Sequence, residues 1–117
     1  MAPWTADGVV SWGGRPVART AAEACPRRRA HLTGAVGAVS VRRQVVAGGP
    51  TPAVPGRPGV AVATEAELDD GTGSVLLRWS GRDGVPGVVV GARLVVEGTV
   101  LADHGRPVLL NPLYRFA

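Results

Sequence analysis

Residues 65–79, EAELDDGTGSVLLRW, decide the fold of this chain. Apolar and polar residues alternate on both sides of Asp70-Gly71, a dipeptide that is typical of tight turns between antiparallel strands. Because successive side chains of a strand point to opposite faces, this alternation puts the apolar set on one side. The side chains predicted to share the buried face are Ala66, Leu68, Val75, Leu77 and Trp79. The stretch therefore predicts a hairpin that is buried on one side.

The same reasoning extends outward from this hairpin. Strands are predicted at residues 29–43, 60–69, 74–80, 92–101 and 107–110. A shift of apolar parity beside Gly37 predicts a β-bulge, which lets the long first strand bend. The segment Asp103-His104-Gly105-Arg106 is typical of a second hairpin turn. Strands joined by two hairpins, with no long helical pattern, predict a small all-β barrel of five strands.

Two segments lack a strand pattern. Residues 1–27 show no steady periodicity, so we expect a flexible N-terminal segment, with at most a short helix over 18–25, before a domain at 28–117. Residues 44–59 are rich in Pro and Gly, which predicts a long loop between the first two strands. Trp4 and Trp12 lie in the N-terminal segment. Docking on the barrel or simple mobility explains them better than stacking on a base.

Charge is distributed unevenly along the chain. Residues 1–59 hold eight Arg against Asp7 and Glu23, whereas residues 60–117 hold five Arg against seven acidic residues. Such a basic half favours a polar, anionic partner. Lys and Ile are absent, which is typical of translation from a G+C-rich genome. Solubility combined with this codon bias explains the charge equally well.

The composition also bears on the compartment. Cys25 is the single cysteine, which excludes an intrachain disulfide and a zinc site with several thiolates. No apolar run approaches the ~20 residues needed to span a bilayer. The N-terminal residues lack the basic and apolar regions of a signal peptide. We therefore expect a cytoplasmic protein that does not contact a membrane.

Several short segments occur together in a characteristic order. They are Arg27-Arg28-Arg29 followed by Leu32-Thr33-Gly34, residues 65–79, Gly81-Arg82, Pro86-Gly87 with Gly91, residues 94–98, and Asn111-Pro112 with Tyr114. In this ordered set the chain resembles the small OB-fold nucleic-acid-binding proteins common in actinobacteria. The resemblance implies an OB-fold, a five-stranded Greek-key barrel that binds nucleic acid.

OB-folds hold single strands with a cationic groove and aromatic platforms on the second and third strands and nearby loops. Trp79 has the parity of the buried residues, so we expect it in the core, and Tyr114 is expected to plug the barrel. Arginines must then supply most of the binding through phosphate contacts, which makes it sequence-tolerant and strongly salt-dependent. Taken singly, each arginine is better explained as a solvated surface residue. The set predicted to bind nucleic acid is Arg42, Arg43, Arg57, Arg78, Arg82 and Arg106.

The sequence gives little support to an enzyme. His31 and His104 lie far apart in sequence and lack a Cys or acidic neighbour at metal-ligand spacing. Asp69 and Asp70 are adjacent, so on a strand their side chains would point to opposite faces. Asp70 is expected to serve the turn before Gly71. We therefore expect no catalytic residues, no metal and no cofactor.

Two functions remain open from the sequence. The first is non-enzymatic binding of single-stranded DNA or RNA, either of which fits. The alternative is a protein–protein interaction module with the barrel as its scaffold. In that case the Pro-rich loop at 48–58 docks on a partner, or a partner adds a strand to an exposed edge. The scarcity of aromatic residues and the acidic set Glu65, Glu67 and Asp69 favour this alternative.

Overall fold

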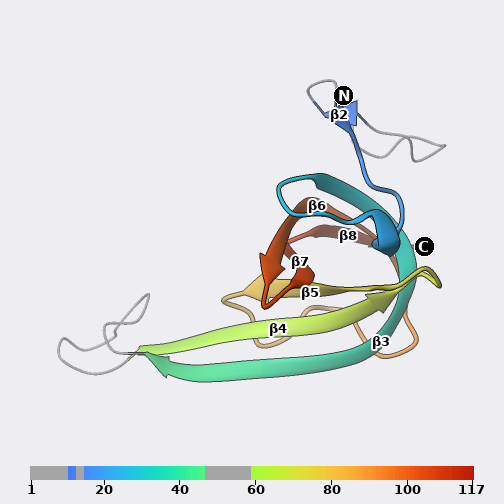
Figure 1. The fold of residues 1–117 in the computed structure, drawn as a ribbon. Helices are drawn as coiled ribbons and strands as arrows, with labels where there is room; N and C mark the ends of the chain where they lie inside the picture. The colour runs from blue at the N-terminus through green and yellow to red at the C-terminus, as the bar shows by residue number, and fades with distance from the viewer. Residues whose placement is uncertain (1–10, 13–14, 47–58) are drawn as a thin grey trace.

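The computed structural model describes residues 11–12, 15–46 and 59–117 (Figure 1). Within these residues the fold is all-β, and the helical content is one 3-10 turn, η1 (Ala21–Glu23). The strands are β1 (Ser11–Trp12), β2 (Arg15–Pro16), β3 (Arg29–Val46), β4 (Gly59–Asp69), β5 (Ser74–Ser80), β6 (Arg93–Asp103), β7 (Arg106–Leu110) and β8 (Leu113–Phe116). The predictions for Trp4, for the Trp12 side chain and for Arg57 lie outside what is described. None of the described segments forms a helix with the length and apolar character that crossing a membrane requires.

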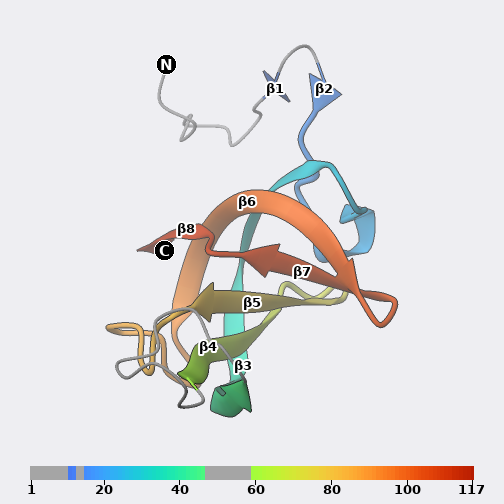
Figure 2. The ribbon, with the colours of Figure 1, turned by 90° about the vertical axis from the view of Figure 1, so that its left-hand side faces the viewer.

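In this part of the chain, five strands form a closed ring. The order is β3-β4-β5-β7-β6, and β6 pairs back with β3. All these pairings are antiparallel except β5 with β7, which are parallel. In Figure 2, β6 arches over β7 and β5 to complete the ring. The all-β prediction with five principal strands is therefore confirmed.

Strand β3 closes the ring because it serves two partners. Residues 29–35 pair with β6, and residues 35–46 pair with β4. The register shifts between Val36 and Ala38, which confirms the bulge predicted beside Gly37. The far ends of β3 and β4 continue past the ring as a two-stranded arm (Figure 1). Here the sequence placed the end of the first strand too early, since β3 runs three residues beyond residue 43.

The strand pattern missed β8. Asn111-Pro112 is typical of a strand end because Pro has no N–H to donate to a ladder. The chain nevertheless resumes pairing, so that β7 lies along the C-terminal part of β6 and β8 along its N-terminal part. Asn111 has a positive φ of 48°, and its amide donates to the Arg78 carbonyl, 2.6 Å away. This local turn lets one continuous segment line the whole of β6.

The ring interior holds the apolar face that the alternation predicts. Trp79 is buried, and its Nε1 donates to the Pro112 carbonyl over 3.2 Å, so its expected place in the core is confirmed. Tyr114 packs edge-on against Trp79 with ring centroids 5.5 Å apart, and its hydroxyl donates to the Pro86 carbonyl. The cluster includes Leu32, Val36, Ala66, Leu68, Val75, Leu77, Leu94, Val96, Val100 and Leu109.

The segment before β3 lies against the ring from residue 17 onward. Ala18 forms a parallel bridge with Ala30, and the His31 amide donates to the Ala18 carbonyl over 2.8 Å. The Ala21 side chain is buried, at the start of η1. Part of the segment predicted as an N-terminal lead thus makes backbone contacts with β3.

Candidate functional site

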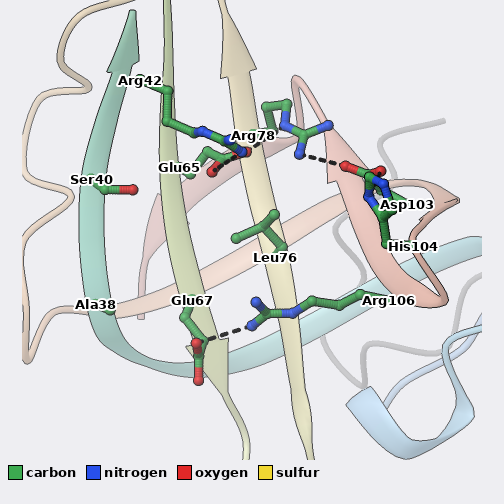
Figure 3. Close-up of a pocket in the computed structure, with 10 residues that line it drawn as sticks. All are labelled: Ala38, Ser40, Arg42, Glu65, Glu67, Leu76, Arg78, Asp103, His104 and Arg106. Carbon is green, nitrogen blue, oxygen red and sulfur yellow. Dashed lines mark hydrogen bonds and ion pairs between the residues drawn. The ribbon is translucent and has the colours of Figure 1, made fainter.

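A shallow pocket lies on the outer face of the ring, across β3, β4, β5 and the hairpin between β6 and β7 (Figure 3). Its volume is about 400 Å³. Alternation explains its position, because Ala66 and Leu77 point inward and their neighbours along the strands point out. The residues that line it are Ala38, Ser40, Arg42, Glu65, Glu67, Leu76, Arg78, Asp103, His104 and Arg106.

Arg78 lies at the centre of the polar contacts in this pocket. Its Nε donates to Glu65 Oε2 over 2.6 Å, and its Nη2 donates to Asp103 Oδ2 over 2.8 Å. The hydrogen bonds to Asp103 and Glu65 raise the pKa of Arg78, and the bond from Arg78 lowers the pKa of Asp103. The Arg78 side chain is 24% exposed and that of Glu65 is 8% exposed. Water therefore screens this ion pair poorly.

The other two arginines of the pocket also face carboxylates. Arg42 Nη1 lies 3.5 Å from Glu65 Oε1, and Arg106 Nη2 lies 3.0 Å from Glu67 Oε2. The arginine of each pair is open to solvent, since the Arg42 side chain is 69% exposed and that of Arg106 is 42% exposed, whereas Glu65 is 8% exposed and keeps its shorter bond from Arg78. Pairs of this kind contribute about 0–1 kcal/mol. Arg42 and Arg106 can therefore exchange their carboxylates for another anion at small cost.

The formal charges of the pocket balance. Three arginines stand against Glu65, Glu67 and Asp103 among its lining residues. The side chain of His104 is almost fully exposed and lies 2.8 Å from Asp103. A phosphate in this pocket would therefore compete with a carboxylate at each arginine.

The structure separates Arg43 and Arg82 from this pocket. Arg43 follows Arg42 on β3 and points to the opposite face of the arm, where its Nη2 lies 3.3 Å from Asp83. Arg82 is exposed on the connection after β5, and its carbonyl accepts the Thr64 hydroxyl. Three of the six predicted residues, Arg42, Arg78 and Arg106, are thus brought together among the described residues.

Asp103 was missed by the sequence reasoning, which assigned it only to a turn. The turn itself is confirmed, because His104 and Gly105 both have a positive φ, at 51° and 77°. The carboxylate reaches Arg78 because β7 pairs with β5 and carries the end of β6 alongside. The sequence signal that could have identified Asp103 is an acidic residue at the base of a hairpin that lies next to the predicted binding strands.

The described residues hold little that points to another chemistry. No three of their His, Cys, Asp and Glu side chains converge on a point where a metal could bind. Glu97 is fully buried on β6, with Oε1 3.6 Å from Arg29 Nη2. Asp70 serves the turn and the N-terminal lead, as its contacts with Thr72 and Ala21 show.

Comparison with known proteins returns no relative. The sequence matches no protein-family model, and neither a curated protein nor a solved structure shows significant similarity. The likeness to the small OB-fold proteins therefore remains a resemblance of segments. The geometry of the pocket carries the functional proposal.

Proposed function

We propose that this protein is an OB-fold that binds single-stranded DNA or RNA without catalysing a reaction. The ring connectivity supports the fold. Its first three strands are consecutive neighbours, and its fifth strand inserts between the third and the fourth. This is the Greek-key connectivity of a small barrel.

The observation that carries the function is the position of the arginine-bearing pocket. It lies on the outer faces of β4 and β5, the second and third strands of the ring, beside the hairpin between the fourth and fifth. OB-folds bind oligonucleotides on this face and with these loops. Arg42 and Arg106 are the proposed phosphate contacts, because both arginine side chains are exposed and their pairs with carboxylates are weak.

Fluorescence anisotropy of labelled single-stranded DNA and RNA, at low and near-physiological salt, tests the proposal. We expect binding that weakens with salt, with a slope of about −0.7 in the logarithmic plot for each phosphate contact. The double variant R42A/R106A should weaken binding and flatten the slope by about 1.4. The control is Arg93→Ala, an exposed arginine on β6 outside the pocket. Absence of binding at low salt would overturn the proposal.

A second candidate, protein binding, is favoured by the arm. Past its pairing with β6, β3 has a partner strand on one edge only over residues 39–46 among the described residues. Val39 and Val41 on this part of β3 are exposed, as is Val60 on the arm. An unpaired strand edge with apolar side chains can accept a strand from another chain. Capture of a partner that survives nuclease and high salt would support this candidate over the first.

A further inference from the structure

Two carboxylates hold the guanidinium of Arg78 by its edge. All N–H bonds of a guanidinium lie in its plane, so the carboxylates of Glu65 and Asp103 contact its edge and not its faces. The two partners come from opposite sides of β5, one from β4 and one from the end of β6 (Figure 3). Arg78 is therefore held from two sides within the pocket.

Two of the five N–H donors of Arg78 are closed to a phosphate. To reach Nε, or the Nη2 proton that Asp103 accepts, a phosphate would have to displace a carboxylate at 2.6 or 2.8 Å. Displacing Glu65 would leave a nearly buried carboxylate without its closest partner, which is costly. Contact with a guanidinium face displaces neither carboxylate. Arg78 thus differs from Arg42 and Arg106, whose side chains are more exposed.

The pocket offers few other platforms. None of the described residues that line it is Phe, Tyr or Trp, and the imidazole of its one histidine, His104, lies on the exposed hairpin turn 2.8 Å from Asp103. Leu76 precedes Arg78 by two positions on the same face of β5 and adds apolar surface beside the guanidinium. Unstacked bases are held by aromatic rings or by the planes of Arg guanidinium groups. The guanidinium plane of Arg78 is therefore chemically suited to a nucleobase.

We propose that Arg78 is the base-stacking platform of this pocket, and that Glu65 and Asp103 are positioning residues that hold its plane. The inference rests on the proposed binding of single strands and assigns a role within it. The ligand is a single nucleobase of the strand, stacked on the guanidinium with Leu76 beside it. Purines, which offer the larger stacking surface, are the preferred class.

The test compares two labelled strands with the same number of phosphates: oligo-deoxyadenylate and an abasic strand of equal length. We expect the native protein to bind the adenine strand more tightly. Arg78→Lys keeps the charge and removes the plane, so it should weaken adenine binding about 5-fold or more while leaving abasic binding unchanged. If Arg78 instead contacts a phosphate, R78K retains affinity for both strands and the platform is ruled out.

A matched pair of carboxamide variants tests the positioning role. Glu65→Gln loosens the Arg78 plane and removes the negative charge that faces both Arg78 and Arg42, so the ratio of adenine to abasic affinity should fall and the salt slope should steepen by up to about 0.7 for each arginine released. Glu67→Gln frees Arg106 on the same face and should steepen the slope with the ratio unchanged. Equal ratios in the two variants would overturn the role of Glu65.

The same data separate the platform from the proposed function. If the native protein binds neither strand at low salt, the proposed function itself fails. If it binds both strands equally, it contacts phosphate alone, and the platform is overturned while the function stands. Circular dichroism melting of each variant shows that the ring remains folded.

Discussion

Asp70 joins the turn between β4 and β5 to the segment before β3. Its Oδ2 accepts the Ala21 amide over 2.7 Å, and its Oδ1 accepts the amide and hydroxyl of Thr72. Burial raises the pKa of Asp70. The hydrogen bonds from the Thr72 side chain and from the amides of Ala21, Thr72 and Gly73 together lower it by more, so the net shift of the pKa is downward. The carboxylate is thus stabilised more in the folded than in the unfolded chain.

The downward shift of the Asp70 pKa predicts how this residue's contribution to stability depends on pH. Asp70→Ala should lower the free energy of unfolding at neutral pH by about 1 kcal/mol, the usual effect of losing a cap. Because the pKa is lower in the folded state, the ionised Asp70 stabilises the fold above pH 3.8, its ordinary pKa, and loses this effect as the pH falls further. The gap between the native protein and D70A should therefore narrow below pH 4 in urea unfolding.

The control for this measurement is Asp83→Ala. Asp83 is exposed and meets Arg43 in an open ion pair, so its loss should change stability by less than about 0.5 kcal/mol. A gap between the native protein and D70A that stays constant from neutral pH to pH 2 would contradict the assigned role of the carboxylate.

At the scale of one element, β3 carries two glycines at or near its bulge, and their surroundings differ. A Cβ on Gly34 would lie 2.5 Å from the Asp69 carbonyl oxygen, whereas a Cβ on Gly37 meets nothing within 4 Å. Gly34→Ala should therefore lower the free energy of unfolding by about 1–3 kcal/mol, the cost of overpacking. Gly37→Ala is the matched control and should change it little. Equal losses in thermal unfolding would show that the bend, rather than the close approach, requires glycine.

The elements themselves were largely predictable from the sequence. Alternation is a local signal, so β5 was predicted with the bounds that it has, and the change of parity located the bulge of β3. The extension of β3 to Val46 was missed because the next segment is rich in Pro and Gly. This composition outweighed the apolar–polar alternation of the last few residues of the strand. Strand β8 was missed because a break at Pro112 was taken for the end of the sheet.

The pairing within the pocket was not predictable in this way. Arg78 and Asp103 are 25 positions apart, and Arg106 and Glu67 are 39 positions apart. They meet because the ring closes, which no local pattern encodes. The sequence correctly placed Glu65, Glu67 and Arg78 on the outer face, yet it treated the arginines as free cations.

Over the whole molecule, the pocket and the net charge are separate features. The chain carries a formal charge of +4, whereas the pocket residues carry equal numbers of arginines and carboxylates. The excess of arginine therefore lies elsewhere in the chain. If the protein binds a nucleic-acid strand as proposed, such a charge acts on the strand over about 10 Å at 0.1 M salt, and the pocket selects what is bound.

Part of the segment before residue 28 is hydrogen-bonded to the ring. The sequence predicts a domain that begins at residue 28, with a flexible segment before it. In the structure Ala18 donates to the Arg29 carbonyl and accepts from the His31 amide, and Ala21 donates to Asp70. These bonds tie the segment to both β3 and the β4–β5 turn, on the far side of β3 from β6.

Amide hydrogen exchange locates the true boundary. If the segment folds with the ring, the amides of Ala18 and Ala21 should exchange nearly as slowly as those of β3, because opening them requires the same cooperative unfolding. D70A should speed exchange at Ala21 more than at Ala18, whose bonds are to β3 alone. Fast exchange at Ala18 and Ala21, with the amide of Leu32 still protected, would show that the segment opens by itself. The folded domain would then begin at residue 28, as the sequence predicts.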